Sequence, residues 1–485
     1  MLYVTKKLGK AATVIAAAVI ALPAIAQQIP SETWMGIYFG QAKVGYASYR
    51  IDKAAYKGKS GYKLESTSVT HLLLLGEEVG QDVNSTAYLN DKFEPLEETF
   101  KMSSSGHTTT ITARFGPNEI TAEVESEGKK STKKIPIPKD SKIVGDSTYF
   151  SGMNLKVGDK LDIKYFNPLS LSLDDVHLEV LRQEELKLGN EIFSAFVIKS
   201  QTALGDMTCW QDSNGELLKV VALMGITMVR EPKDVAMSTP DAGTYTPPSD
   251  LAVATSAPTT TEIPYPRQVR HMKITLSGLT DKALIINDTR QKVMPVESEK
   301  PVAQYEITAR QYQPLGAASL PISKPELEKY LSDGPYVQPT DPEIVSAAKQ
   351  IVGGEKNSYK AASMIRAWIH AEMQSKSDIG ILRSSVDVLH AKTGVCRDYA
   401  ILYTALARAA GIPTKLVAGL VFWKGGFYYH AWAESYIGEW IPMDATLPTD
   451  LVDATHIKLA EGDATAMFDM IKIMGTLKAE IVEFK

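Results

Sequence analysis

Three residues in the last quarter of the chain carry side chains that covalent catalysis can use: Cys396, His430 and Asp444. A cysteine can attack a carbonyl as a thiolate, and a histidine can accept and return the proton. An aspartate can hold the imidazole in the orientation and tautomer that this requires. The three residue types together therefore predict a nucleophilic cysteine site, provided that the fold brings them into contact.

The sequence around Cys396 predicts that the thiol lies in the first turn of a buried helix. Apolar residues follow it at helical spacing, and Gly411 with Pro413 marks the end of the helix. The unpaired backbone N–H groups and the positive dipole end at a helix start favour the thiolate over the thiol. A small cysteine buried in the core is the alternative, and it is the commoner one for a single cysteine. The residues at helical spacing are Ala400, Leu402, Tyr403, Leu406 and Ala409.

His430 and Asp444 fall on predicted neighbouring strands. Alternating runs predict strands over 416–422, 427–436 and 440–443, with His430 inside the second and Asp444 at the end of the third. Because consecutive antiparallel strands usually pair, the imidazole and the carboxylate are expected side by side. Taken singly, His430 could be a core histidine and Asp444 could be a strand-end cap.

Four blocks of this region resemble the transglutaminase-like superfamily, over about residues 326–460. The resemblance implies a papain-like fold with Cys396 as nucleophile, His430 as general base and acid, and Asp444 as the residue that holds the imidazole. Members of the superfamily often have proline where this chain has Ala445, which we interpret as a turn variant. Residues 453–459 also resemble the tail of bacterial members, and leave His456 either a catalytic role or a structural hydrogen bond. The four blocks are residues 394–400, 408–413, 430–434 and 440–446.

The implied chemistry is acyl transfer from an amide through a thioester on Cys396. The acceptor could be water, as in a peptidase or amidase, or an amine, as in a crosslinking transamidase; hydrolysis is the favoured interpretation. A third hypothesis is a non-enzymatic envelope protein that uses the fold for binding. The Cys396 backbone N–H is one expected oxyanion donor, and Trp368 could be a second donor or simply a buried aromatic. No cofactor and no metal site is predicted, and no acidic loop indicates the calcium dependence of animal transglutaminases.

The rest of the chain predicts a multidomain protein. Residues 27–235 read as a β-rich domain, an antiparallel sandwich or open barrel, since short alternating runs recur between turn signals such as Asp212–Gly215. A linker rich in Ser, Thr and Pro is expected over 236–262, and a small β unit over 263–322. Residues 323–485 form the expected α+β transglutaminase-like domain, with helices first and an antiparallel sheet after them. Asp341 and Pro342 mark the start of its first helix.

The N-terminus predicts export. Residues 1–26 combine three lysines, a short apolar run and the small-x-small sequence Ala24-Ile25-Ala26, which is typical of a signal peptide. No later segment is long and apolar enough to span a bilayer. We therefore expect an exported protein, periplasmic or extracellular, from a bacterium.

The composition limits the classes of binding partner that the sequence predicts. Apolar residues make up 44% of the chain, charged residues 22%, and the net charge is -5, which indicates neither nucleic acid nor an anionic membrane as a partner. A peptide or protein substrate is expected, and the oligomeric state is left open. With only two cysteines, a Cys209–Cys396 disulfide is possible, but a reactive Cys396 beside an incidental or buried Cys209 is the favoured interpretation.

Overall fold

The computed structural model describes residues 29–74, 76–104, 106–126, 128–139, 141–144, 156–202, 205–238, 250–295, 302–376, 382–464 and 466–485. The expected signal peptide, residues 1–26, lies outside these residues, as do residues 239–249 of the expected linker. The described chain forms two compact units that divide between Asp250 and Leu251.

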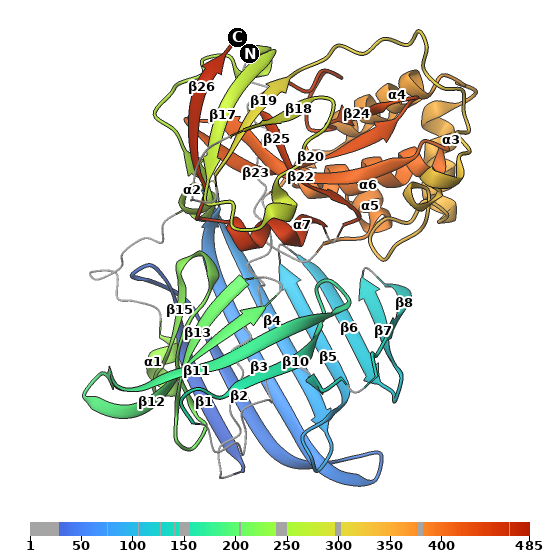
Figure 1. Ribbon diagram of the computed structural model, residues 1–485. Coiled ribbons are helices and arrows are strands. Elements are labelled where there is room, and N and C mark those ends of the chain that lie inside the picture. Colours follow the sequence, from blue (N-terminus) through green and yellow to red (C-terminus); the bar gives the residue numbers. More distant parts are fainter. Residues whose placement is uncertain are drawn as a thin grey trace. The chain divides into compact units, whose positions relative to one another are not determined.

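The N-terminal unit is built on one large sheet. Within the described residues it has 15 strands, in the order β8 down to β1 and then β15 down to β9 (Figure 1). Every neighbouring pair is antiparallel except β9 and β10. The strands are β1 Ser31–Phe39, β2 Ala42–Tyr56, β3 Lys59–Leu74, β4 Glu77–Leu89, β5 Pro95–Ser104, β6 His107–Phe115, β7 Glu119–Ser126, β8 Lys129–Pro136, β9 Ile143–Val144, β10 Lys160–Asn167, β11 Ser172–Leu188, β12 Glu191–Thr202, β13 Gly205–Asp212, β14 Leu217–Val221 and β15 Ile226–Arg230.

Local sequence explains much of this sheet. Along β6, buried residues alternate with more exposed ones, as expected for a strand with one face on a core. The predicted Asp212–Gly215 hairpin joins β13 to β14, and the Asp212 side chain accepts from the backbone N–H groups of Asn214 and Glu216 at 2.9 and 2.8 Å. The sheet curls, since the rings of Phe115 on β6 and Phe166 on β10 meet edge to face at 5.8 Å. The all-β prediction is confirmed, as one continuous curled sheet.

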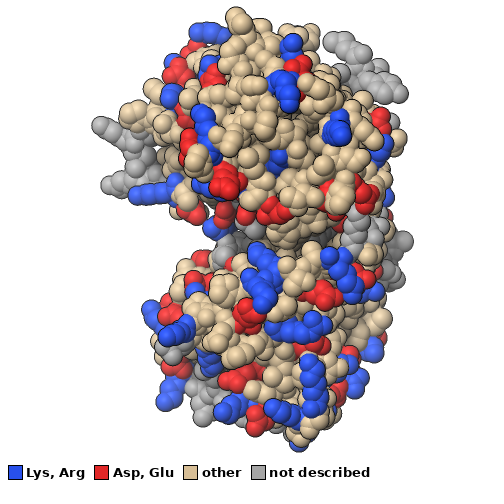
Figure 2. Space-filling view, turned by 90° about the vertical axis from the view of Figure 1, so that its right-hand side faces the viewer, with Lys and Arg blue, Asp and Glu red and all other residues tan. Residues whose placement is uncertain are grey.

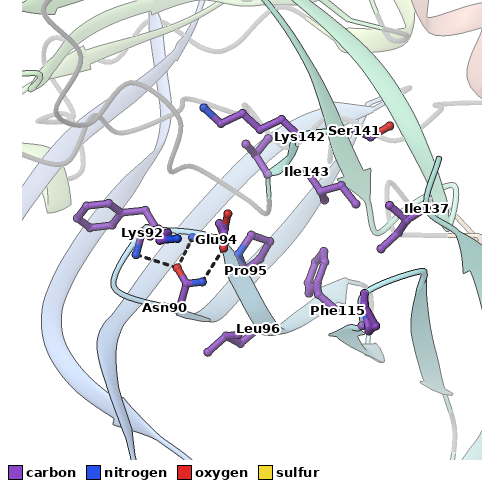
Figure 3. Close-up of a pocket in the computed structure, with 14 residues that line it drawn as sticks. Asn90, Lys92, Glu94, Pro95, Leu96, Phe115, Ile137, Ser141, Lys142 and Ile143 are labelled. Carbon is purple, nitrogen blue, oxygen red and sulfur yellow. Dashed lines mark hydrogen bonds between the residues drawn. The ribbon is translucent and has the colours of Figure 1, made fainter. Parts of the chain in front are cut away.

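A pocket of about 510 Å³ opens in this unit, lined by turns and strand ends from Asn90 to Val144 (Figure 3). The Asn90 side chain shapes one wall, because its oxygen accepts from the backbone N–H groups of Lys92 and Glu94 at 2.8 and 2.9 Å. None of the three predicted catalytic residues lines it.

The C-terminal unit places helices before an antiparallel sheet, as predicted. Its main sheet has the order β16-β23-β22-β25, with β24 also paired to β23, and α6 packs against β22 and β23 (Figure 1). The elements of this unit that precede β22 in the chain include α2 Leu251–Thr255, β16 Ala257–Pro258, α3 Pro342–Val352, α4 Ser358–Glu372, β20 Gln374–Ser375, α5 Ser385–Ala391, β21 Thr393–Gly394 and α6 Cys396–Ala409. The later elements are β22 Thr414–Trp423, β23 Gly426–Tyr436, β24 Trp440–Met443, β25 His456–Gly462 and α7 Ala466–Asp469.

The region expected as a small β unit joins the end of the chain. Its strands β17 His271–Ser277, β18 Gln291–Met294 and β19 Val302–Thr308 form a sheet with the last strand, β26 Lys478–Phe484. Residues 251–258, expected as linker, instead form α2 and β16 in the structure, and β16 pairs with β23. The described residues between Leu251 and Ile322 are therefore part of the same compact unit as the predicted catalytic region.

Helix starts follow their predicted signals. Asp341 caps α3 by accepting from the Glu343 N–H at 2.9 Å, with Pro342 in the first turn, and Gly353 ends the helix. α6 begins at Cys396, and all but one of its residues are buried. The predicted buried helix that starts at the cysteine is confirmed.

Basic and acidic side chains are intermixed on the face of the molecule shown in Figure 2. This agrees with the modest net charge of -5. Across the described residues, no helix combines the length and the apolar character that crossing a membrane would need.

Candidate active site

Cys396 is held at the first position of α6 by the residues on either side of it. The Val395 N–H donates to the Asp398 carboxylate at 2.9 Å, which fixes the turn that enters the helix. The entrance is tight at Gly394, where a Cβ atom would lie 2.4 Å from Asp398 Oδ2 and 2.5 Å from Arg383 Nη2. Only glycine fits there without displacing the buried ion pair. Cys396 is 3% exposed.

The Asp398 carboxylate does not cancel the positive end of α6, because arginines neutralise it. Arg383 Nη2 lies 3.0 Å from Asp398 Oδ2, and Arg383 Nε donates to Oδ1 at 3.3 Å. Burial alone would raise the pKa of Asp398, but the charges of Arg383 and Arg397 outweigh it and the pKa is lowered. The helix start therefore keeps its preference for a negative sulfur.

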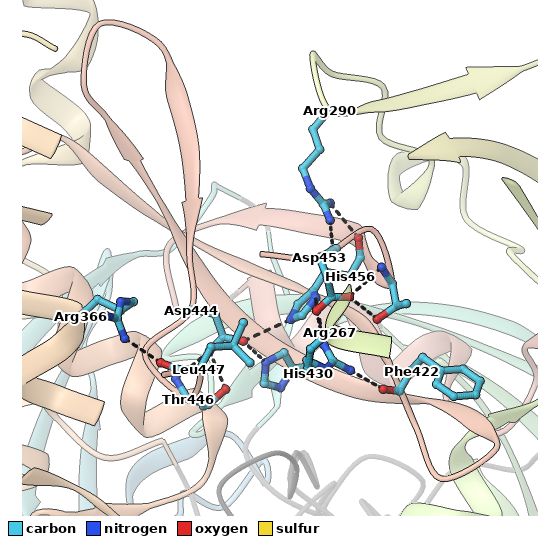
Figure 4. A network of polar contacts seen from close by, with 11 residues as sticks. Arg267, Arg290, Arg366, Phe422, His430, Asp444, Thr446, Leu447, Asp453 and His456 are labelled. Atoms are coloured by element: carbon cyan, nitrogen blue, oxygen red, sulfur yellow. Dashed lines mark hydrogen bonds and ion pairs between the residues drawn. The ribbon is translucent and has the colours of Figure 1, made fainter. Parts of the chain in front are cut away.

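His430 and Asp444 lie side by side, as their strands predicted. Pairing of Ala433 with Met443 sets β24 against β23, so that Asp444, the residue directly after β24, faces the imidazole. His430 Nε2 and Asp444 Oδ2 are 2.7 Å apart, and both side chains are buried (Figure 4). The other carboxylate oxygen of Asp444, Oδ1, accepts hydrogen bonds from the backbone N–H of Thr446 at 2.8 Å and from the hydroxyl of Thr446 at 2.6 Å. Asp444 is thus locked with one oxygen aimed at the imidazole.

The second nitrogen of His430 is available to the cysteine. Nδ1 is buried without a hydrogen-bond partner, and Cys396 interacts with this imidazole. Burial favours the neutral ring, but the charge and hydrogen bond of Asp444, with a smaller contribution from Cys396, outweigh it and raise the pKa of His430 to about 9. At neutral pH the imidazole is therefore protonated beside the thiol, which stabilises a thiolate.

His456 also contacts this pair. Its Nε2 lies 3.2 Å from the same Asp444 Oδ2, and the centroids of the His456 and His430 rings are 5.5 Å apart. Burial alone would raise the pKa of Asp444, but His430 and His456 together hold it well below the ordinary range. The structural hydrogen bond that the sequence allowed for His456 is present, and its partner is the candidate catalytic aspartate.

Two tryptophans differ in their relation to the site from what the sequence suggested. Trp368, considered as an oxyanion donor, is half-buried on α4, with the Lys392 ammonium 5.5 Å from its ring centroid. Trp432 instead stacks on His430, with ring centroids 6.0 Å apart and planes at 26°. Gly419 makes room for it, since a Cβ there would lie 2.9 Å from the Trp432 ring. The alternation of β23 puts Trp432 two residues from His430, a signal that sequence alone could have used.

His430, Asp444 and His456 are also the described residues that come closest to a metal-binding cluster, with ligand atoms within 4.8 Å of one another. However, the N–O separations of 2.7 and 3.2 Å are those of hydrogen bonds already formed. The donor set fits a chain of proton donors and acceptors, and a cation would have to displace it.

Cys209 has no comparable surroundings. It lies buried on β13 in the N-terminal unit, and burial raises the pKa of its thiol to about 12. Both cysteines are free, so the disulfide alternative is not formed. Of the two thiols, only Cys396 has a histidine beside it.

Comparisons with known proteins find matches both for the region of the candidate site and for the N-terminal unit. Residues 345–445 match the family model of the transglutaminase-like superfamily, and residues 36–228 match a family described as a protein of unknown function, DUF3108. Among curated proteins, one uncharacterized protein of Mycobacterium leprae is 25% identical over 146 residues, which cover 28% of this chain and 51% of that protein. An uncharacterized protein of Haemophilus influenzae is 28% identical over 165 residues, covering 28% of this chain and 42% of that protein. The matches thus span about half the length of these relatives.

Solved structures show partial likenesses. A candidate cysteine protease from Cytophaga hutchinsonii has a TM-score of 0.32 at 20% identity, covering 45% of this chain and 86% of that one. A beta-barrel-like protein of the DUF1849 domain from Brucella abortus has a TM-score of 0.29 at 9% identity, covering 42% of this chain and 94% of that one. A candidate protease from Parabacteroides distasonis has a TM-score of 0.21 at 12% identity, covering 81% of this chain and 70% of that one. TM-scores of this size do not assign a function.

Proposed function

We propose that this chain, whose residues 345–445 form a transglutaminase-like core, is an exported cysteine-dependent enzyme that acts on amide bonds of peptides or proteins. The observation that carries the proposal is the placement of His430. It lies between a locked carboxylate at 2.7 Å and the thiol at the start of α6. A core histidine would need neither neighbour.

The arrangement supports acyl transfer in two stages. The Cys396 thiolate attacks the amide carbonyl, and the developing oxyanion is stabilised by the Cys396 backbone N–H, which has no preceding helical carbonyl as a partner. His430, protonated at neutral pH, gives its proton to the departing amine, and a thioester forms on Cys396. In the second stage, neutral His430 takes a proton from the acceptor as it attacks the thioester. The C–S bond breaks, and Cys396 leaves as a thiolate beside the protonated imidazole.

Hydrolysis is the first candidate for the second stage, with a transamidase as the alternative. Water and a primary amine would be activated by the same imidazole, so the two outcomes differ only in which acceptor the site admits. A non-enzymatic binding role is disfavoured by the complete set of Cys396, His430 and Asp444. Export is proposed from the signal-peptide pattern of residues 1–26.

A single incubation distinguishes these functions. A mixture of glutamine- and lysine-containing peptides is treated with the protein in H₂¹⁸O that contains a biotinylated primary amine, and the products are analysed by mass spectrometry. Hydrolysis gives ¹⁸O-labelled carboxylates, whereas transamidation gives biotinylated peptides. Cys209→Ala is the matched control and should keep the activity, while Cys396→Ala should lose it.

If Cys396→Ala keeps the wild-type products, the cysteine mechanism is wrong. If neither product forms in the wild type at any pH from 6 to 9, the binding role becomes the better description.

A further inference from the structure

Asp444, the aspartate that contacts His430, has a counterpart nine residues further along the chain, Asp453. The two aspartates match in the sequence that follows them and in their hydrogen bonds. Both are the first residue of an Asp-Ala-Thr segment, 444–446 and 453–455. In each segment the aspartate Oδ1 accepts from the N–H and the hydroxyl of the threonine two residues later: 2.8 and 2.6 Å at Asp444, 2.9 and 2.5 Å at Asp453. In each, Oδ2 is left to face a histidine.

His456 joins the two segments. Its Nε2 lies 3.2 Å from Asp444 Oδ2, and its Nδ1 lies 3.3 Å from Asp453 Oδ2 (Figure 4). All three side chains are about 1% exposed or less, so water does not compete for these contacts. Since the Asp444 carboxylate is ionised and can only accept, Nε2 of His456 must be the donor.

Two arginines from the segment between Leu251 and Ile322 contact Asp453 and His456, at the end of this chain of contacts that is away from His430. Arg267 Nη1 donates to Asp453 Oδ2 at 2.5 Å and lies 3.4 Å from His456 Nδ1, while Nη2 donates to the Phe422 carbonyl. Arg290, which is buried, donates to the backbone carbonyls of Asp453 and His456. Burial alone would raise the pKa of Asp453, but His456 and Arg267 lower it, so this carboxylate is ionised as well.

We propose that Asp453 and His456 form a second histidine–aspartate pair, anchored by Arg267, which positions Asp444 so that His430 can act on Cys396. The proposal rests on the cysteine chemistry proposed above. His456 is a positioning residue, because it acts through Asp444 and does not contact the thiol or a reacting bond. Without the His456 donor, Oδ2 of Asp444 is held by His430 alone, so one hydrogen bond fewer opposes rotation of the carboxylate away from the imidazole.

The groups that face His456 determine the expected pH behaviour. They are Asp444 and Asp453 at its two nitrogens, Arg267 beside Nδ1, and the rings of His430 and Trp432 at 5.5 and 5.4 Å. The charge and hydrogen bond of Asp444 contribute most to the raised pKa of His430. Misorientation of the Asp444 carboxylate should therefore lower that pKa.

The test follows His430 directly and needs no substrate. Histidine-selective ¹³C labelling reports the titration of each imidazole, and His430 is assigned by the signal lost in His430→Gln. In the wild type, His430 should titrate near pH 9. In His456→Phe its midpoint should fall by at least about one pH unit, and alkylation of Cys396 by iodoacetamide at pH 7 should slow roughly tenfold, the size of one hydrogen bond to a charged group.

Two further variants make the result specific. His456→Gln retains an N–H donor near the position of Nε2. It should bring the alkylation rate of Cys396 to within about threefold of wild type, and the His430 midpoint to within about half a pH unit. Ile457→Val alters the neighbouring buried residue on β25 without touching a polar contact, and should leave the His430 titration unchanged.

A measurement on the wild type guards against variants that do not fold. ¹⁵N NMR at pH 7 should show the His456 Nε2 protonated; an unprotonated Nε2 cannot donate to Asp444 and overturns the proposal. A folded His456→Phe protein with an unchanged His430 midpoint and alkylation rate overturns it too. Failure of the proposed function is distinguishable, since it would appear as wild-type activity in Cys396→Ala and would leave the coupling between the two histidines intact.

Discussion

Replacing Asp444 by Asn should disable Cys396 while leaving the fold in place. The amide has nearly the shape of the carboxylate, and its oxygen can still accept from the Thr446 N–H and hydroxyl. Its NH₂ group would then face His430 Nε2, which would have to accept instead of donate. The imidazole proton would move to Nδ1, and the nitrogen beside the cysteine could no longer take the proton of the thiol.

The size of this effect follows from the pKa of His430. A rise from the ordinary 6.5 to about 9 means that the site favours the protonated imidazole by roughly 3 kcal/mol. Burial opposes that rise and Asp444 is its largest source, so most of this free energy disappears with the carboxylate. The equilibrium for proton transfer from Cys396 to His430 should therefore fall by roughly 300-fold.

Alkylation measures this directly. The second-order rate with iodoacetamide is determined at pH 7, and the modified cysteine is identified by peptide mapping. Cys209 is an internal control, since burial and a pKa of about 12 should keep it unreactive in every folded variant. Circular dichroism checks the fold. A folded Asp444→Asn protein whose Cys396 is alkylated within twofold of the wild-type rate would refute the reasoning.

Three further predictions follow from the same contacts. Because the pKa of His430 is raised, the protonated imidazole stabilises the fold fully below pH 6.5, and this contribution is lost as pH rises through about 9. Urea unfolding should therefore show a free energy of unfolding that falls over this pH range. The fall should be smaller in His430→Gln. Gly394→Ala should destabilise the protein by ~2 kcal/mol or more, since its Cβ would lie 2.4 Å from Asp398 Oδ2, whereas Gly354→Ala, with open space around it, should unfold in urea much as the wild type does. Intact mass of the exported protein should place the mature N-terminus near Gln27; a retained N-terminus would mean an anchor instead.

Local signals predicted the elements that position the site. The spacing of apolar residues after Cys396 was enough to place a buried helix, which the structure has as α6. Alternation and turn residues were enough for the strands that bear His430 and precede Asp444, because each strand is followed at once by its partner. Such neighbours need no knowledge of distant contacts.

What sequence patterns missed depends on contacts between residues far apart in the chain. Leu251 to Pro258 lie in a stretch with linker composition, yet β16 pairs with β23, about 170 positions later. Arg267 and Arg290 give no local hint of their role, since their partners lie in the segment 453–456. The repeated Asp-Ala-Thr segment was visible in the sequence, but only the structure shows that one histidine bridges its two copies.

The central claim is that Cys396 forms a thioester with help from His430. It is tested most directly by rapid acid quenching of the protein mixed with the active peptides, followed by mass analysis of the peptide that contains Cys396. We predict an acyl adduct on Cys396 in the wild type and in Cys209→Ala, strongly reduced in His430→Ala and absent in Cys396→Ala. Turnover without any adduct on Cys396, or an adduct that forms equally fast in folded His430→Ala, would contradict the account.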